Sequence, residues 1–380
     1  MMRRKMFAGY RTAVLTAILA MGFGMMANAE TAAPDIAGLV FDSKMELTYA
    51  ECFDVYYYQD GYKLIDVHDS AQYLIVPEGK EAPEDVAEDI RVLQQPLDTI
   101  YMAATSPMAL FVALDGLDQI RLSGVDASGW TVQEAADAIE DGRILFAGKY
   151  NEPDYELLVG EDCDLAVEST MILHDPKVQE MIEALDIPVF IDRSSYESHP
   201  LGRTEWIKVY GAMLNKEDTA ESFFAEQAAV IDEMANYENT GKTVVFFYIN
   251  TTGSPVVRSP KDYISSMIEI AGGKNAFADL PDDSGKTSVQ ITMEEFYNTA
   301  VDADYLIYNG SIDATVNSME DLLAKDGLLA DFKAVQEGNV WVTDKSMYQA
   351  TDTIGQLMND IHLMLTEQDA SGMRFLKKIQ

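Results

Sequence analysis

Tyrosine and arginine side chains recur in short polar segments that follow predicted strands, and their types indicate binding chemistry. A tyrosine offers a flat apolar ring face and a polar hydroxyl, and its phenolate is a hard ligand for ferric iron. An arginine can donate two parallel hydrogen bonds to an oxyanion. The candidates for ligand contact are Thr105, Ser106, Tyr150, His174, Tyr196, Tyr248, Arg258 and Tyr348. Together they favour a large, partly aromatic anion as ligand.

Structural roles are the alternative for each candidate. The chain has 19 tyrosines, so many of them must be core or rim residues. His174 can ligate haem or cobalt as a neutral imidazole, although a lone loop histidine is more often simply solvated. Arg203 is also conspicuous among scarce basic residues, but it follows Glu197 and His199 and is expected to brace a helix start.

Signatures of catalysis and of metal or cofactor sites are not found. The sequence has no GxSxG elbow, HExxH, P-loop or GxGxxG motif, and no CxxC or Cys/His cluster. We therefore expect no enzyme activity, no cofactor and no resident metal. Cys52 and Cys163 can pair in an oxidising compartment, or remain two buried thiols; both alternatives stay open.

The N-terminus has the pattern of an export signal. Basic residues at 3–5 precede an apolar run over 12–26, and Ala27-Asn28-Ala29 offers the small residues that a signal peptidase reads. We expect cleavage before Glu30, with an uncleaved anchor as the alternative. The apolar run is shorter than the roughly 20 residues of a membrane span. The cleavage region lacks a cysteine for lipidation, so the mature protein is expected to be free in the periplasm.

Size and charge limit the classes of partner. Cleavage would leave 351 residues, enough for two lobes, and a net charge of −41 in place of the −37 of the whole chain. Such a charge argues against nucleic acid and anionic lipid surfaces as partners. The acids are interleaved with apolar residues, as on the solvated faces of a folded protein.

The hydrophobic periodicity of the chain predicts an α/β protein with two doubly wound lobes. The expected parts are a signal peptide at 1–29, a β-rich segment packed on the first lobe at 30–95, an N-terminal lobe at 96–202, a linking helix at 203–237 and a C-terminal lobe at 238–380. The linking region is expected to be one long helix or two nearly continuous ones. Residues 77–95 are polar, contain two prolines and are expected to form a loop.

Six stretches resemble a known family. They are LDTIYMAATSPMALFVAL at 97–114, AGKYNEPDYELLVGEDCDLAVES at 147–169, LDIPVF at 185–190, HPLGRTEWIKVYGAMLNKEDTAESFF at 199–224, IEIAGGKNAFADL at 268–280 and FKAVQEGNVWVTD at 332–344. In this order they resemble the periplasmic substrate-binding proteins of ABC importers for iron-siderophores, haem and cobalamin. The resemblance covers roughly residues 95–380, and the β-rich segment at 36–76 is more elaborate than is usual there.

The resemblance implies a function and partners. It implies a monomer that captures an iron-siderophore-type chelate and delivers it to a permease dimer and its ATPase, with haem or a corrinoid as the alternative ligand. In this family one exposed glutamate of each lobe docks on the permease, and the matching positions are Glu156 and Glu294. Both begin predicted helices, where the helix dipole also favours a carboxylate.

Overall fold

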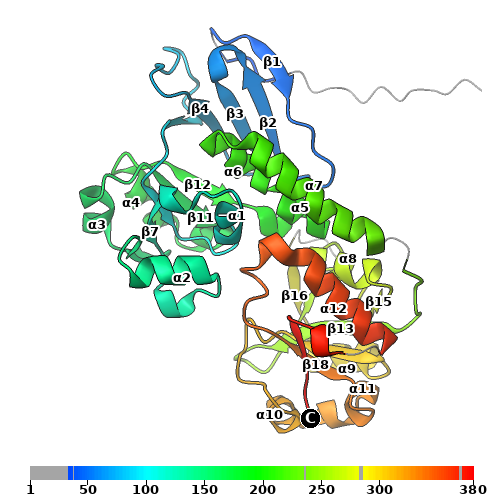
Figure 1. Cartoon of the computed structure of the whole chain (residues 1–380). Coiled ribbons are helices and arrows are strands. Elements are labelled where there is room, and N and C mark those ends of the chain that lie inside the picture. The colour runs from blue at the N-terminus through cyan, green and yellow to red at the C-terminus, as the bar shows by residue number, and fades with distance from the viewer. Residues whose placement is uncertain (1–32, 37, 235–236, 282–285, 368–369) are drawn as a thin grey trace, which may run out of the picture. The chain divides into compact units, whose positions relative to one another are not determined.

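The computed structural model describes residues 33–36, 38–234, 237–281, 286–367 and 370–380 (Figure 1). The chain divides into a short unit of residues 1–34 and a large unit of residues 35–380, and all features below belong to the large unit. The predicted signal segment lies outside the described residues. None of the described helices is long and apolar enough to cross a membrane.

The β-rich segment is a five-stranded sheet with the order β1-β2-β3-β4-β5. Its strands are β1 (Phe41–Lys44), β2 (Phe53–Tyr58), β3 (Lys63–Val67), β4 (Gln72–Val76) and β5 (Ile90–Gln94). Neighbours are antiparallel except β4 and β5, which are parallel. The prediction of a loop over the whole of 77–95 is wrong at β5. This edge strand buries only Leu93 fully, so its burial pattern is too weak to stand out in the sequence.

The N-terminal lobe is built on a sheet with the order β12-β11-β6-β7-β8, and all of these strands are parallel. The strands are β6 (Ile100–Met102), β7 (Ile120–Ser123), β8 (Leu145–Phe146), β11 (Leu165–Ser169) and β12 (Val189–Asp192). Its helices are α1 (Met108–Ala113), α2 (Gln133–Glu140), α3 (Tyr155–Gly160) and α4 (Pro176–Glu183). The strand order reverses between β6 and β11, which makes this point the topological switch of a doubly wound sheet.

Three helices replace the expected linking helix: α5 (Pro200–Glu205), α6 (Ile207–Leu214) and α7 (Glu217–Met234). The prediction of one long helix, or two, is corrected for a local reason. Asn215 adopts a left-handed conformation with φ 56° and ends α6. A Cβ on Gly211 would lie 2.7 Å from the Cβ of Ala220, so α6 and α7 pack closely side by side. The long helix in Figure 1 is α7.

The C-terminal lobe has a seven-stranded sheet with the order β16-β14-β13-β17-β18-β19, and β15 also pairs with β13. Its strands are β13 (Thr243–Ile249), β14 (Pro255–Arg258), β15 (Lys274–Asn275), β16 (Ser288–Gln290), β17 (Tyr305–Tyr308), β18 (Val340–Thr343) and β19 (Leu376–Lys378). Its helices are α8 (Tyr263–Ile270), α9 (Met293–Ala300), α10 (Met319–Lys325), α11 (Lys333–Gln336) and α12 (Ile354–Thr366). The parallel centre is β13-β17-β18, and β14, β16 and β19 are antiparallel additions.

Two carboxylates fix the N-terminal sheet to the linking region. Glu205 accepts hydrogen bonds from the backbone amides of Thr48, Tyr49 and Ala50 at 2.8–3.1 Å. Glu197 accepts from the amides of residues 51 and 52, and from the indole nitrogen of Trp206 at 2.8 Å. Both glutamates are almost fully buried, and these bonds satisfy carboxylates that burial would otherwise penalise.

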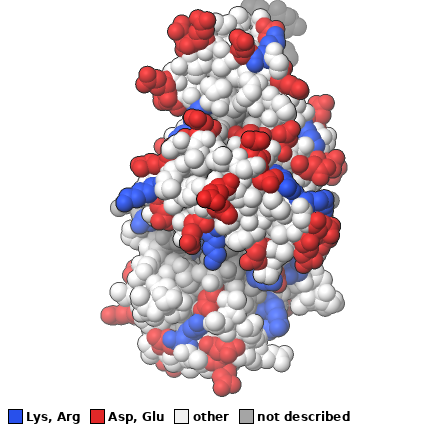
Figure 2. Space-filling model, turned by 90° about the vertical axis from the view of Figure 1, so that its left-hand side faces the viewer, with Lys and Arg blue, Asp and Glu red and all other residues white. Residues whose placement is uncertain are grey.

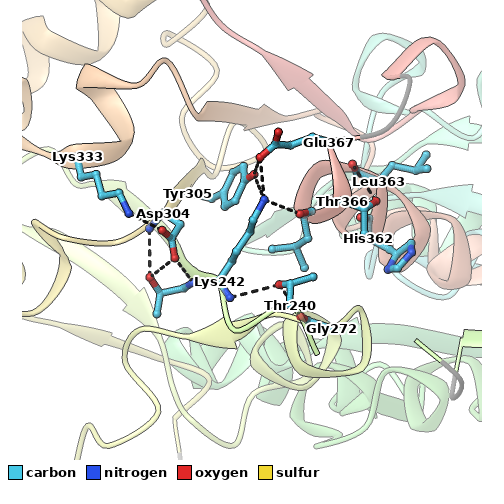
Figure 3. A network of polar contacts seen from close by, with 12 residues as sticks. Thr240, Lys242, Gly272, Asp304, Tyr305, Lys333, His362, Leu363, Thr366 and Glu367 are labelled. Atoms are coloured by element: carbon cyan, nitrogen blue, oxygen red, sulfur yellow. Dashed lines mark hydrogen bonds and ion pairs between the residues drawn. The ribbon is translucent and has the colours of Figure 1, made fainter. Parts of the chain in front are cut away.

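A paired polar network closes the amino ends of the C-lobe strands (Figure 3). Lys242 donates to the hydroxyl of Tyr305 at 3.0 Å, to the carbonyl of Leu365 at 2.9 Å and to Glu367 at 2.8 Å. Asp304 accepts from the amide of residue 243, and it accepts from the amine of Lys333 at 2.6 Å. Because these groups satisfy one another, this edge of the sheet is held together by its own polar contacts.

The acidic residues are spread over the surface that Figure 2 shows and do not gather in one patch. This agrees with their interleaving in the sequence. Of the two alternatives for the cysteines, the structure has two free thiols at Cys52 and Cys163. Burial raises the pKa of both thiols to about 12, so neither is a ready nucleophile.

Candidate functional site

A cavity of about 310 Å³ lies at the carboxyl ends of β6, β7 and β11, beside the topological switch. Its lining includes Thr105, Asp126, Phe146, Lys149, Tyr150 and Ser169. In open parallel sheets this edge is where ligands bind. The structure therefore brings two of the predicted residues, Thr105 and Tyr150, into one cavity with a cation, an aromatic ring and hydroxyl groups.

A glycine turn places Lys149 and Tyr150 at the cavity. Gly148 has φ +79°, and a Cβ there would lie 2.3 Å from the carbonyl oxygen of Glu152. Only glycine fits this close approach, which pairs β9 (Gly148–Lys149) with β10 (Glu152–Pro153). The hydroxyl of Tyr101 donates to the Gly148 carbonyl at 3.0 Å and holds the turn against β6.

Ser106 is engaged within the protein. Its hydroxyl donates to Asp192 at 3.2 Å, and Asp192 also accepts from the hydroxyls of Ser194 and Tyr210. Asp192 is only 2% exposed and ends β12. This set connects the start of α1 to α6, so Ser106 positions the loop beside the cavity.

Glu168 is a buried carboxyl that the sequence prediction did not single out. It precedes Ser169 in β11, is fully buried, and neither of its oxygens has a hydrogen-bond partner among the described residues. Burial raises its pKa to about 9, so the group is neutral near pH 7. A neutral carboxyl thus lies one residue away from the cavity lining.

The C-lobe brings Tyr248, Arg258 and Tyr348 into one neighbourhood. Burial raises the pKa of the Tyr248 hydroxyl, with a further contribution from Tyr348 and an opposing one from Arg258. The hydroxyl of Tyr348 accepts from the amide of Asn309 at 2.7 Å. Arg258 forks onto the buried carboxylate of Asp262 with two bonds of 2.8 Å, so part of its donor capacity is already used.

A second guanidinium faces the same carboxylate. Arg203 of α5 is 3% exposed and lies 4.3 Å from the ring centroid of Tyr263, which follows Asp262. Burial raises the pKa of Asp262, and Arg258 and Arg203 both oppose that rise. Among the described residues, Arg258 forms the ion pair with Asp262, and Arg203 interacts with this carboxylate only over a longer distance and has no ion pair of its own, in a chain of net charge −37.

Several buried polar atoms around this charge have no partner among the described residues. They are Nε of Arg203, the hydroxyl of Tyr263, Oδ1 of Asn309 and the hydroxyl of Thr351. Such groups are rare in folded proteins, because each one costs about 1–3 kcal/mol when left unsatisfied. These atoms could therefore form hydrogen bonds with a ligand.

A side-chain amide connects the two lobes. Gln349, the neighbour of Tyr348, accepts from the amide and hydroxyl of Thr131 at 2.7 and 2.8 Å, and it donates to the Gly129 carbonyl at 2.9 Å. The loop that contains Thr131 begins at Gly124, which lines the N-lobe cavity. The cavity and the tyrosine-arginine neighbourhood therefore belong to loops that touch one another.

The remaining predicted residues lie outside this cavity. His174 is exposed at the end of the 3₁₀ segment Thr170–His174. The ring of Tyr196 lies 4.7 Å below the guanidinium of Arg193 and is 38% exposed. Glu156 and Glu294 are exposed on the first turns of α3 and α9. Across the described parts of the chain, no group of three or more His, Cys, Asp or Glu residues could hold a metal ion.

Asp126, Glu168 and Asp262 are not predicted from the sequence. Asp126 follows β7, and its position after a strand end is a signal that could have found it. By contrast, Glu168 lies inside a strand, and no local pattern reveals an unpaired buried carboxyl. The Arg203–Asp262 juxtaposition depends on α5 packing against α8, which one sequence cannot show.

Comparison with known proteins identifies relatives of this chain. The family model described as periplasmic binding protein matches residues 102–347. Two uncharacterized lipoproteins of Methanocaldococcus jannaschii are 26% and 24% identical; the alignments cover 82% and 74% of this chain and 80% and 67% of the relatives.

Solved structures share the fold at low sequence identity. A periplasmic binding protein from Veillonella parvula has a TM-score of 0.57 at 16% identity, covering 85% of this chain and 98% of that one. A possible iron-binding protein from Staphylococcus epidermidis has a TM-score of 0.55 at 15% identity, covering 70% and 98%. A periplasmic haem-binding protein of Vibrio cholerae has a TM-score of 0.55 at 16% identity, covering 70% and 97%.

The relatives correct the expected location. The prediction of an unlipidated protein, free in the periplasm, is wrong, because both archaeal relatives are named lipoproteins. A lipoprotein is held at a membrane by a covalently attached lipid, and this is what the names say of these two relatives. The prediction depended on the composition around residues 27–29, which lie outside the described part of the chain.

The two lobes, the doubly wound sheets and the family match over residues 102–347 agree with one another. The chain therefore belongs to the periplasmic binding protein family, as a solute-binding protein of the two-lobed type whose solved members include siderophore- and haem-binding proteins of ABC importers.

Proposed function

We propose that this protein captures an iron-siderophore-type metal chelate outside the cytoplasm and delivers it to the permease dimer and ATPase of an ABC importer. The observation that carries the proposal is the excess positive charge of Arg203 and Arg258 over Asp262, surrounded by unpaired polar atoms, in a strongly acidic chain. A buried cation with spare hydrogen-bonding capacity favours an anionic ligand.

The two lobes would contribute different contacts. In the N-lobe, Thr105 and Lys149 offer polar groups, and Tyr150 offers a ring face for an aromatic or apolar part of the ligand. In the C-lobe, Tyr248, Tyr348 and Arg258 would contact the anionic part. Ser106, His174 and Tyr196 border the site in this proposal and do not line the N-lobe cavity.

Ligand titration tests the proposal directly. The purified protein would be titrated with a ferric catecholate siderophore, a ferric hydroxamate siderophore, hemin and cobalamin, with intrinsic fluorescence as the signal. We expect saturable binding of a ferric siderophore. If only hemin or cobalamin binds saturably, the ligand is haem or a corrinoid and the transport role is unchanged. If no chelate binds, the proposal is overturned.

Substitution of Tyr150 tests the site. Loss of the ring in Tyr150→Ala removes apolar contact worth about 1.4 kcal/mol, so affinity should fall about tenfold. The matched control is Tyr155→Ala, because Tyr155 is also a partly buried tyrosine of the N-lobe but does not line the cavity. Equal losses in the two variants would show that the cavity is not the binding site.

A test of docking by Glu156 and Glu294 needs control glutamates that also lie on first helical turns, because removing any such glutamate loses a favourable interaction with the helix dipole. Glu134 on α2 and Glu320 on α10 are exposed glutamates on first helical turns, one in each lobe. We expect Glu156→Ala with Glu294→Ala to abolish chelate uptake by cells while purified protein still binds the chelate. Glu134→Ala with Glu320→Ala should leave uptake unchanged. Normal uptake with the first pair would show that these residues do not dock.

A further inference from the structure

A second cavity, larger than the N-lobe cavity, lies at the outer edge of the C-lobe sheet. It has a volume of about 630 Å³ and is bordered by β18, β19 and the segment 314–317. Cavities of this size are typical of small-molecule sites. Its lining is unusual for this protein, because it includes the basic residues Lys345, Arg374, Lys377 and Lys378 and a single acidic residue, Asp344.

These four bases form no close ion pair within the described part of the chain, although Asp352 and Asp360 interact with Arg374, and Glu367 with Lys378, over longer distances. None of them lies within 4.0 Å of a described carboxylate, although the chain has 64 acidic and only 27 basic residues. Asp344 accepts from the amide and hydroxyl of Ser346 at 2.8 and 2.6 Å, so its carboxylate is occupied locally. In so acidic a protein, four bases without an ion pair around one cavity create a local field that attracts anions.

The wall of the cavity combines aromatic and polar surface. Lys378 lies opposite Trp341 in the β18–β19 pair, with its amine 5.9 Å from the ring centroid. Trp341 is 6% exposed, and its indole N–H has no partner among the described residues. Lys377 and Lys378 are both exposed, and both line the cavity. The cavity thus offers exposed cations and one buried donor that has no partner among the described residues.

This position is separate from the site proposed above. The edge strand β19 lies two strands away from β17, and the switch of the C-lobe sheet falls between β13 and β17. The tyrosines and arginines of the proposed chelate site do not line the edge cavity. The two cavities can therefore be tested independently.

We propose that the β18–β19 edge cavity is a second binding site, which takes a small anion with two or more negatively charged phosphate or carboxylate groups. The lysine and arginine tips neutralise the anionic groups, and the indole N–H of Trp341 donates to one of their oxygens. A compact soluble anion fits better than an extended anionic surface, because the net charge of −37 repels such a surface as a whole.

Calorimetric titration of the full protein with pyrophosphate and with citrate tests this site. We expect one of these probes to bind, and the double variant Lys377→Gln with Lys378→Gln to weaken its affinity about tenfold. The control is Lys177→Gln with Lys261→Gln, which removes the same charge from two exposed lysines in other regions that form no ion pair with a described carboxylate. The control should change the affinity less than twofold. Equal losses in both double variants, or no binding of either probe, would overturn the proposal.

Two further measurements locate the anion and its source. Bound anion should shift the fluorescence of the wild-type protein, and Trp341→Phe should remove that shift while chelate binding persists. A shift that survives in Trp341→Phe would place the anion elsewhere and overturn the proposal. Binding to phosphatidylglycerol vesicles but not to pyrophosphate or citrate would also overturn the proposal, because the cavity would then recognise a lipid surface and not a small soluble anion.

Discussion

The carboxylate of Glu205 has an unusual concentration of contacts. It is fully buried, it accepts from three consecutive backbone amides, and it lies 3.2 Å from the amine of Lys208. Lys208 is also buried and forms a second ion pair of 2.8 Å with the exposed Glu221. The same lysine therefore has one buried and one exposed partner.

This arrangement gives a matched pair of substitutions. Glu205→Ala leaves three amides without their acceptor and leaves the buried ammonium of Lys208 with only the exposed Glu221 as ion-pair partner, so we expect a loss of about 3–5 kcal/mol in the free energy of unfolding. Glu221→Ala removes the exposed partner and should cost less than about 1 kcal/mol. Urea denaturation measures both. Similar values for the two variants would contradict the role given to Glu205.

Glu168 gives a prediction about pH. Its folded-state pKa is about 9, well above its ordinary value, because the group is buried without a partner. Below about pH 4 both folded and unfolded chains bind the proton, so Glu168→Gln should change stability little. As pH rises, the unfolded chain releases its proton while the folded chain retains it, and the wild-type protein loses stability until about pH 9.

At pH 8, Glu168→Gln should therefore be more stable than the wild type by about 2 kcal/mol or more, measured by urea denaturation. The gain should shrink as the pH falls to about 4. The exposed Glu140 supplies the control, and Glu140→Gln should show no such trend. A gain for Glu168→Gln that is the same at both pH values would show that the raised pKa is not its cause.

At this scale, the sequence predicted residues that its loops expose and missed those that packing makes special. Thr105 and Tyr150 follow predicted strands, and the rule that ligands bind at carboxyl ends was sufficient to select them. Glu168 depends on which side chains surround it, and so does Arg203, which the sequence singled out only as a residue that braces a helix start. A sequence records their types but not the absence of a partner.

Among the elements, α6 and α7 depend on one small residue. Gly211 is inside α6, where alanine normally stabilises a helix by about 0.5–1 kcal/mol relative to glycine. Here a Cβ would meet the Cβ of Ala220 at 2.7 Å and the carbonyl oxygen of Lys216 at 3.2 Å. The close approach of the two helices should outweigh the helix propensity.

We therefore expect Gly211→Ala to destabilise the protein by about 1–3 kcal/mol. Gly160→Ala is the control, because a Cβ there meets nothing within 4 Å, and it should be neutral or slightly stabilising. Combining Gly211→Ala with Ala220→Gly should recover part of the loss. Thermal unfolding of the wild type and these three variants measures the loss and its recovery. If the double variant recovers none of the loss, the clash is not with Ala220.

The sequence predicts helices and strands well where their hydrophobic periodicity is strong, and poorly at exposed strands on the edge of a sheet. The expected β-rich segment is a five-stranded sheet, and its strands β2, β3 and β4 are largely buried. The strand β1 has every residue exposed, so alternation gives no signal there. The break at Asn215 lacks the glycine or proline that usually marks it, although asparagine is among the few residues that tolerate a left-handed backbone.

At the scale of the whole molecule, the hydrogen bonds of Gln349 to Thr131 and Gly129 link the two lobes directly. Gln349→Ala removes three hydrogen bonds and should cost about 1–2 kcal/mol. It should also speed hydrogen exchange at the Thr131 amide, which loses its acceptor. The control is Gln336→Ala, whose amide bonds only to Asp331 within the C-lobe. Unchanged exchange at Thr131 would show that the link does not hold the lobes.

The contacts of Glu197 and Glu205 also have a consequence for the order in which this protein folds. They join residues that lie 145–157 positions apart in the chain. Contacts between such distant residues close long loops and form slowly. During synthesis, the β1–β2 connection emerges long before its acceptors, which follow β12. The sheet that is translated first can therefore be anchored only after the whole N-lobe has been made.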